Sequence, residues 1–133
     1  MRNKLLLVDD DAVVQMLHQM TFANLGVQNE LMTFENGKKA LEYLQNGAIN
    51  DAEQFVIFLD INMPVMGGWE FLDALEKEKK IIDICKVYIV SSSINLIDKN
   101  KSKTYKNVIE YIEKPLNLEK CKTILTDLNI KSN

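Results

Sequence analysis

Cysteine is scarce in this sequence, and the two that occur lie far apart in otherwise apolar segments. Cys85 and Cys121 lack the CxxC spacing of a metal or redox pair, so both are expected to be reduced core residues and not a disulfide. Long apolar runs are also missing, since no stretch approaches the ~20 residues of a membrane span. The start of the chain has only four apolar residues between Lys4 and three aspartates, unlike a signal peptide. We therefore expect a cytoplasmic protein without membrane insertion.

Neither sign of charge dominates the sequence. The formal net charge is −3, which gives no general field for nucleic acid, and no direct nucleic-acid binding is expected. Hydrophobic residues make up 47% and charged residues 26% of the 133 residues, the balance of a folded globular protein. This length suits one domain, and no linker or repeat interrupts it. We expect a single domain over residues 1–133 without an output domain, so any effect must pass through a partner protein.

Short β-rich runs alternate with stretches of helical period, which predicts βα units on a parallel sheet. Each helical stretch carries a stripe of apolar residues, and each stripe is expected to pack on the sheet. The predicted strands are Lys4–Val8, Glu30–Phe34, Phe55–Leu59, Val87–Val90 and Ile109–Ile112. The predicted stripes are Val13, Leu17 and Met20; Ala40, Leu41 and Leu44; Phe71, Leu72 and Leu75; and Leu118, Cys121, Leu125 and Leu128.

The segment from Asp98 to Lys106 differs from the other helical stretches, because it holds four lysines and few apolar residues. A helix with so small an apolar face is weakly held by packing. Two interpretations stay open: a solvated helix, or a mobile basic surface for a partner.

Three aspartates, Asp9, Asp10 and Asp11, follow the first predicted strand directly. Carboxylates this close repel one another, and a cation would remove that repulsion. Hard oxygen ligands suit Mg²⁺, which typically takes one or two carboxylates together with water and phosphate oxygens. Asp11 is also suited to be the N-cap of the helix that follows.

Further polar residues occupy the carboxyl ends of other predicted strands. Asp60 closes the third strand, Ser91 the fourth and Lys114 the fifth. In an open α/β sheet these ends converge on one crevice, so we expect one pocket with carboxylates, a hydroxyl and an ammonium. Such a set fits phosphoryl transfer to a carboxylate, with Asp60 as the nucleophile and Mg²⁺ on the aspartates of the first strand. Ser91 would donate a hydrogen bond to the phosphoryl group, and Lys114 would pair with its remaining charge.

Four segments together resemble the response-regulator receiver family of two-component signalling, and the resemblance covers nearly the whole chain. They are Leu6–Asp11, Phe58–Pro64 with Gly67 and Gly68, Ser91–Ser93 and Tyr111–Pro115. The resemblance implies a flavodoxin-like α/β fold, a doubly wound five-stranded parallel sheet in the order 2-1-3-4-5 with five helices. It also implies a phosphoacceptor switch and not an enzyme, with self-phosphorylation from small donors and self-dephosphorylation as its only chemistry. The phosphoryl group would come from a histidine kinase or a histidine phosphotransfer protein.

The resemblance assigns a role to each polar residue of the pocket. The ligands of Mg²⁺, for which Mn²⁺ could substitute, would be Asp9, Asp10, Asp60 and the backbone carbonyl of Asn62. The residues that act on the phosphoryl group and read it out would be Ser91, Lys114 and the aromatic switch residue Tyr111. The downstream partner is expected on a face that spans residues 98–128. His18, alone in mid-helix, is not the phosphodonor and is expected at the surface or its boundary.

Three alternatives use a similar inventory or fold. A haloacid-dehalogenase-type phosphohydrolase also pairs an Asp nucleophile with Mg²⁺, but its nucleophile follows the first strand with a second Asp two residues on, whereas position 62 here is Asn. A flavodoxin relative would need a Ser/Thr/Gly phosphate loop where Asp9–Asp11 stand. A receiver that serves only as an unphosphorylated scaffold normally lacks one of the key groups, and all are present here.

Overall fold

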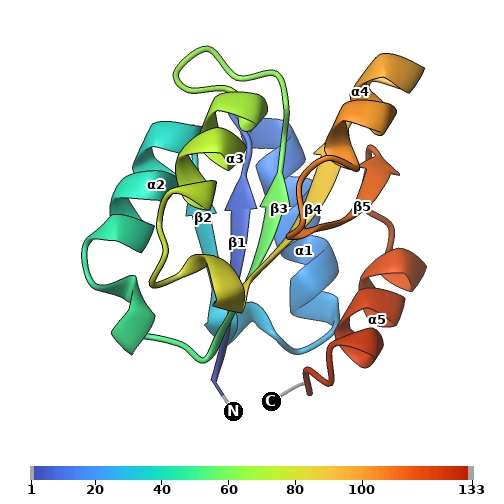
Figure 1. Cartoon of the computed structure of the whole chain (residues 1–133). Coiled ribbons are helices and arrows are strands. Elements are labelled where there is room, and N and C mark those ends of the chain that lie inside the picture. The colour runs from blue at the N-terminus through green and yellow to red at the C-terminus, as the bar shows by residue number, and fades with distance from the viewer. Residues whose placement is uncertain (1, 132–133) are drawn as a thin grey trace.

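The computed structural model describes residues 2–131, and these form a parallel sheet between helices. The strands are β1 (Asn3–Val8), β2 (Leu31–Phe34), β3 (Gln54–Leu59), β4 (Cys85–Ser91) and β5 (Val108–Glu113). The helices are α1 (Ala12–Asn24), α2 (Gly37–Gln45), α3 (Gly68–Glu76), α4 (Leu96–Ser102) and α5 (Leu118–Asp127). Short 3₁₀ helices are η1 (Gln28–Glu30), η2 (Ala48–Asn50) and η3 (Ile82–Ile84). The strand order β2-β1-β3-β4-β5 confirms the expected fold (Figure 1). Across residues 2–131, no helix has the length and apolar character to cross a membrane.

Helices cover both faces of the sheet, with α2 and α3 on one face and α1 and α5 on the other (Figure 1). Successive side chains of a strand point to opposite faces. Leu6 and Val8 of β1 therefore pack in the core toward α2 and α3, whereas Leu5 and Leu7 pack in the core toward α1 and α5. Because helices cover both faces of the sheet, the central strands β1, β3 and β4 are buried along most of their length.

The two cysteines divide between these two cores. Cys85 belongs to the core on the α2 and α3 face, and Cys121 to the core on the α1 and α5 face. Both are buried free thiols, which confirms the prediction of reduced core residues.

Parallel pairing brings the carboxyl ends of the strands to one edge of the sheet. Val8, the last residue of β1, lies in register with Leu59, the last residue of β3. The residues that follow are held at the same edge by the backbone, because the Asp60 N–H donates to the Val8 carbonyl at 2.9 Å. The Lys114 N–H donates in the same way to the Ser91 carbonyl, also at 2.9 Å.

Helix α1 corrects one prediction from the sequence. The stripe of Val13, Leu17 and Met20 was expected to pack on the sheet, but these side chains are 61%, 47% and 58% exposed. The buried residues of α1 are His18 and Phe22. The expectation of a surface or boundary histidine was therefore also wrong. Apolar residues lie on more than one side of this helix, so their spacing did not determine which side faces the core.

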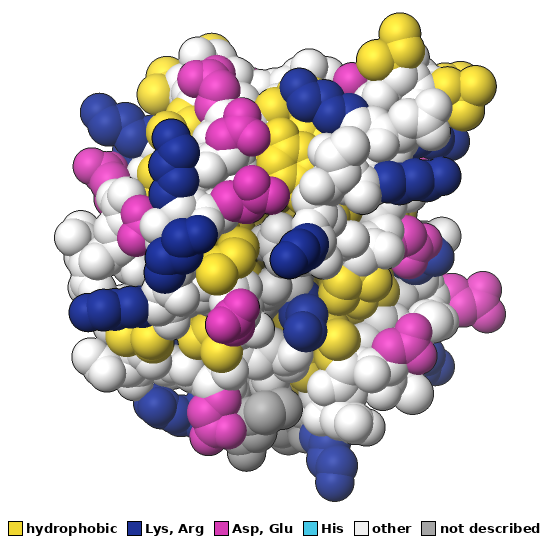
Figure 2. All heavy atoms as spheres, viewed as in Figure 1, with side chains coloured by type: hydrophobic (Ala, Val, Ile, Leu, Met, Phe, Trp, Pro, Cys, Tyr) yellow, Lys and Arg dark blue, Asp and Glu magenta, His cyan; other side chains and the backbone are white. Residues whose placement is uncertain are grey.

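Helix α4 is short and largely solvated. Of its seven residues only Ser102 is buried, and the aliphatic side chains of Ile94, Leu96 and Ile97 are exposed. Figure 2 shows apolar side chains that stand out from the corner of the molecule where α4 lies. This confirms the solvated helix within Asp98–Lys106, while its use as a mobile basic surface stays a prediction.

The segment after α4 is anchored to α3. Tyr105 is buried, its ring stacks on Trp69 at 5.9 Å between ring centres, and its hydroxyl donates to Asp73 at 2.7 Å. The Lys101 ammonium lies 4.8 Å from the centre of the Trp69 ring, a favourable cation–π distance. The amino end of α4 is thus exposed, whereas its carboxyl end is fixed in place.

Candidate functional site

An acidic pocket lies at the carboxyl edge of the sheet. Carboxylate oxygens of Asp9, Asp10 and Asp60 all lie within 4.8 Å of one another, so the structure brings together the aspartates that the sequence predicted. Asp9 and Asp60 are buried, and Asp10 is exposed. A hard oxygen donor set that stays open to water on one side fits Mg²⁺, which keeps several water ligands.

The loop after β1 is built to present Asp9. The Asp9 carboxylate accepts a hydrogen bond from the Asp11 N–H at 2.9 Å. The Asp11 carboxylate in turn accepts from the N–H groups of Val13 and Val14 at 2.9 and 3.2 Å. This satisfies free donors at the start of α1 and confirms Asp11 as the N-cap.

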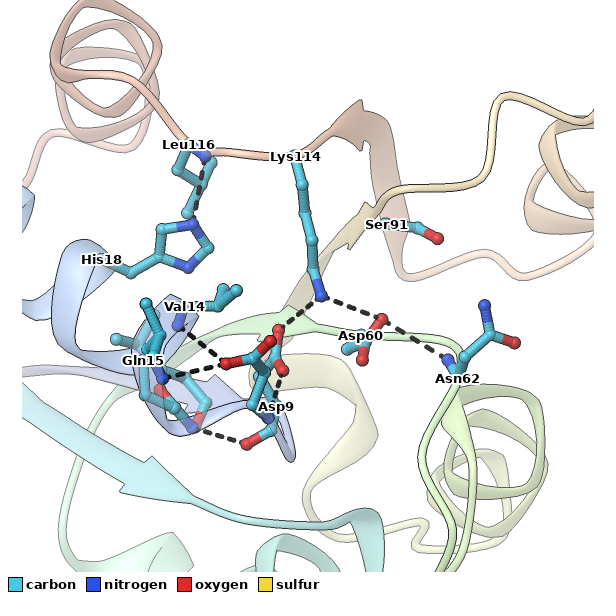
Figure 3. A network of polar contacts seen from close by, with 12 residues as sticks. Asp9, Val14, Gln15, His18, Asp60, Asn62, Ser91, Lys114 and Leu116 are labelled. Carbon is cyan, nitrogen blue, oxygen red and sulfur yellow. Dashed lines mark hydrogen bonds and ion pairs between the residues drawn. The ribbon is translucent and has the colours of Figure 1, made fainter.

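Lys114 reaches across the pocket to both buried carboxylates. Its ammonium lies 2.8 Å from an oxygen of Asp9 and 3.5 Å from an oxygen of Asp60 (Figure 3). Of the two carboxylates, Asp9 is the closer partner. Burial lowers the pKa of Lys114, but the hydrogen bond to Asp9 and the charge of Asp60 outweigh burial, so the pKa is raised overall. The lysine is therefore charged at neutral pH.

The charge of Asp60 is poorly compensated within the pocket. Burial raises its pKa first, and the negative charge of Asp9 adds to this, while Lys114 and the Asn62 N–H act in the opposite direction; the result is a pKa of about 6. The Asn62 N–H lies 3.4 Å from the Asp60 carboxylate. Without a further cation, the pocket holds more negative charge than its own donors neutralise.

The loop from Asp60 to α3 is closely packed on itself. The Gly68 N–H donates to the Ile61 carbonyl at 2.9 Å. A Cβ atom at Gly68 would lie only 2.7 Å from the Asp60 carbonyl oxygen, so no larger residue fits there without a backbone shift. This contact holds α3 against the backbone that carries Asp60 and Asn62.

Ser91 and Tyr111 are connected through Ser93. Ser91 is fully buried, and its hydroxyl oxygen accepts a hydrogen bond from the Ser93 N–H at 3.1 Å. The half-buried Tyr111 donates its hydroxyl to the Ser93 carbonyl at 2.9 Å. The Ser93 hydroxyl donates to Asp98 at 3.0 Å, in the first turn of α4. This role of Ser93 was missed in the sequence analysis. A signal was present, because a serine side chain can hydrogen-bond the backbone N–H two residues further along the chain.

The comparisons with known proteins agree with this geometry. Residues 5–126 match the family model for the response regulator receiver domain. Two-component response regulator 24 of Arabidopsis thaliana is 32% identical over 124 residues, which cover 93% of this chain and 82% of the relative. A two-component response regulator from Cytophaga hutchinsonii has a similar structure, with a TM-score of 0.83 and 26% identity over 96% of this chain and 98% of that one.

A further similar structure is the response regulator protein TrrA of Thermotoga maritima, which was crystallised in complex with Mg²⁺ and BeF. Its TM-score is 0.71, with 26% identity over 96% of this chain and 99% of that one. The family match over most of the chain, the strand order and the acidic pocket lead to the same conclusion. This chain belongs to the response-regulator receiver domain family of two-component signalling.

Proposed function

We propose that Asp60 accepts a phosphoryl group from a phosphohistidine on a histidine kinase or a histidine phosphotransfer protein. A carboxylate oxygen attacks phosphorus, the phosphorus–nitrogen bond breaks, and the imidazole leaves with its electron pair and takes up a proton. The observation that carries the proposal is the position of Asp60, buried between two other carboxylates and the Lys114 ammonium. The chain is then a switch with a phosphoacceptor and not an enzyme that acts on free substrates.

The metal ligands in this proposal are Asp9, Asp10, Asp60 and the backbone carbonyl of Asn62. Mg²⁺, or Mn²⁺ in its place, would supply positive charge for the phosphoryl oxygens. The grouping of the three carboxylates supports this, and so does the Mg²⁺ and BeF complex of the similar T. maritima protein. Lys114 pairs with a phosphoryl oxygen after transfer and weakens its contact with Asp9.

The phosphorylated state is read out through Ser91 and Tyr111. The new group brings roughly two negative charges, and the Ser91 hydroxyl turns toward it as a donor. The Ser93 N–H then loses its acceptor, and the loop that Tyr111 holds by its hydroxyl shifts. Tyr111 turns inward into the space that the loop leaves. The Ser93–Asp98 hydrogen bond passes this shift to α4.

The downstream partner docks on the face that spans residues 98–128, inside the cytoplasm. Three lysines of this face, Lys101, Lys103 and Lys106, are exposed, which favours an acidic partner. The exposed aliphatic residues Leu96 and Ile97 border the lysines and would anchor the partner's apolar side chains. Only phosphorylation-dependent docking is expected, because α4 must shift first.

The direct test is to incubate the protein with acetyl phosphate and Mg²⁺ and to weigh the product by mass spectrometry. One phosphoryl group that hydroxylamine removes is expected on Asp60. Asp60→Asn should take none, whereas Asp83→Asn, which changes an exposed carboxylate, should be labelled like the natural protein. Labelling that persists in Asp60→Asn or in excess EDTA would contradict the proposal. Absence of labelling in the natural protein would favour the unphosphorylated scaffold, and family membership leaves the phosphohydrolase alternative without support.

A further inference from the structure

The inward face of α1 is polar next to the acidic pocket. Gln15 directs its side-chain nitrogen at three backbone carbonyls, those of Leu7 at 3.1 Å, Asp9 at 3.1 Å and Phe34 at 3.0 Å. These carbonyls lie at and just beyond the ends of β1 and β2, and the Phe34 carbonyl also accepts from the Asp9 N–H at 3.1 Å. Three acceptors around one amide nitrogen also fix which way the amide points. Gln15 therefore ties the residue Asp9 to the end of the neighbouring strand.

His18, one turn further along α1, makes the corresponding contact to the loop after β5. Its Nε2 accepts a hydrogen bond from the Leu116 N–H at 3.1 Å (Figure 3). Leu116 is two residues after Lys114, and Pro115 between them has no N–H. This is the first backbone donor beyond Lys114.

His18 can accept this bond only as the neutral ring, with its proton on Nδ1. Burial, the largest influence, lowers the pKa of His18, the charge of Asp9 raises it, and that of Lys114 lowers it further. These are the charged groups that face the ring from β1 and from the end of β5. The lowered pKa keeps the imidazole neutral at neutral pH, so the acceptor is available.

We propose that His18 and Gln15 are positioning residues, with which α1 fastens the two loops that carry Lys114 and Asp9 and so holds this ion pair in place beside Asp60. The proposal rests on the function proposed above. A lysine has a long flexible side chain, so its reach depends on how well its backbone is fixed. A displacement of about 1 Å in the position of such a charged group slows group transfer strongly. It also explains the orientation of α1, because Gln15 and His18 face the loops while Val13, Leu17 and Met20 face solvent.

The test compares His18→Leu, which removes the acceptor, with His18→Gln, whose amide oxygen can stand where Nε2 stands. His18→Asn, which is polar but too short to reach Leu116, replaces the leucine variant if that variant fails to fold. Gln19→Leu changes an exposed neighbour on the same helix and is the control. With acetyl phosphate and saturating Mg²⁺, His18→Leu should accept the phosphoryl group roughly five- to tenfold more slowly. His18→Gln and Gln19→Leu should stay within about twofold of the natural protein.

A second measurement does not depend on phosphorylation. The chemical shifts of the labelled Lys114 side chain at one fixed pH report its contact with Asp9, whose oxygen lies 2.8 Å from the ammonium. They should change in His18→Leu and be restored in His18→Gln. A folded leucine or asparagine variant with the natural transfer rate and the natural Lys114 shifts would overturn the proposal. If the natural protein takes no phosphoryl group at all, the proposed function fails, and the Lys114 shifts alone decide whether His18 positions the lysine.

Discussion

Replacing Asp60 with asparagine removes a buried negative charge that destabilises the metal-free fold. The pKa of Asp60 is raised from 3.8 to about 6, first by burial and then by Asp9. The folded protein therefore binds this proton more tightly than the unfolded chain does. The stabilisation from proton binding is fully present below about pH 4 and is lost as the pH rises through about 6.

The size of the effect follows from the two pKa values. Their difference corresponds to about 3 kcal/mol of unfolding free energy lost by about pH 7, and little solvent screening applies because Asp60 is only 5% exposed. Asparagine resembles the protonated acid in size and charge. In the absence of metal, Asp60→Asn should therefore be more stable than the natural protein by up to about 3 kcal/mol at pH 7.5, or roughly 10 °C in Tm.

The assay is a series of thermal melts between about pH 4 and 8 in EDTA, with Asp83→Asn as the surface control. The gain of Asp60→Asn should vanish near pH 4 and grow through pH 6, and Asp83→Asn should show no such trend. Mg²⁺ should then stabilise the natural protein by mass action and Asp60→Asn much less. Equal stability of the two proteins at pH 7.5, or a gain that is the same at every pH, would refute the reasoning.

Substitutions at three further positions and one exchange measurement test the rest of the proposed switch. Asp10→Asn should weaken Mg²⁺ binding in a calorimetric titration and raise the metal-free Tm by a few degrees, because one of three clustered carboxylates loses its charge; a lower Tm would count against crowding. Lys114→Met should still be phosphorylated by acetyl phosphate but should bind the partner at least tenfold more weakly, and natural partner affinity would exclude its role in coupling. Tyr111→Ala should uncouple phosphorylation from partner binding. Tyr111→Phe should show partner binding intermediate between that of the natural protein and that of Tyr111→Ala, because it loses only the hydrogen bond to Ser93. Amide exchange with beryllofluoride and Mg²⁺ should change around residues 91–112 in the natural protein, and a change confined to the Asp60 loop would contradict this switch.

The strands and the pocket could be predicted because their signals are local or follow from sheet geometry. The five strands lie within two residues of their predicted ends, since each is a short β-rich run bounded by turn residues. The meeting of Asp9, Asp60 and Lys114 follows from parallel pairing, which brings the carboxyl ends of strands to one edge. The strand order itself came from the family resemblance and not from periodicity.

The packing of α1 could not be predicted, because periodicity shows where apolar residues repeat but not which side meets the core. Val13, Leu17 and Met20 formed a regular stripe, yet the side with His18 and Phe22 is buried. That choice depends on backbone groups outside the helix, since Gln15 donates to the Phe34 carbonyl at the end of β2 and His18 accepts from the Leu116 N–H after β5. A donor 98 residues away from His18, the Leu116 N–H, leaves no local pattern in the sequence. The closer pairing of Lys114 with Asp9 than with Asp60 is likewise a matter of tertiary distances.

Cys85 and Cys121 allow the opening of the two cores to be monitored separately, because each core contains one of them. Burial raises the pKa of both thiols to about 12, so in the closed fold neither supplies the thiolate that reacts with alkylating reagents. One thiol lies beneath α2 and α3, and the other belongs to α5. The order in which they become labelled in mild denaturant therefore reports which helical layer leaves the sheet first. The natural sequence thus provides a reporter of local opening for each layer.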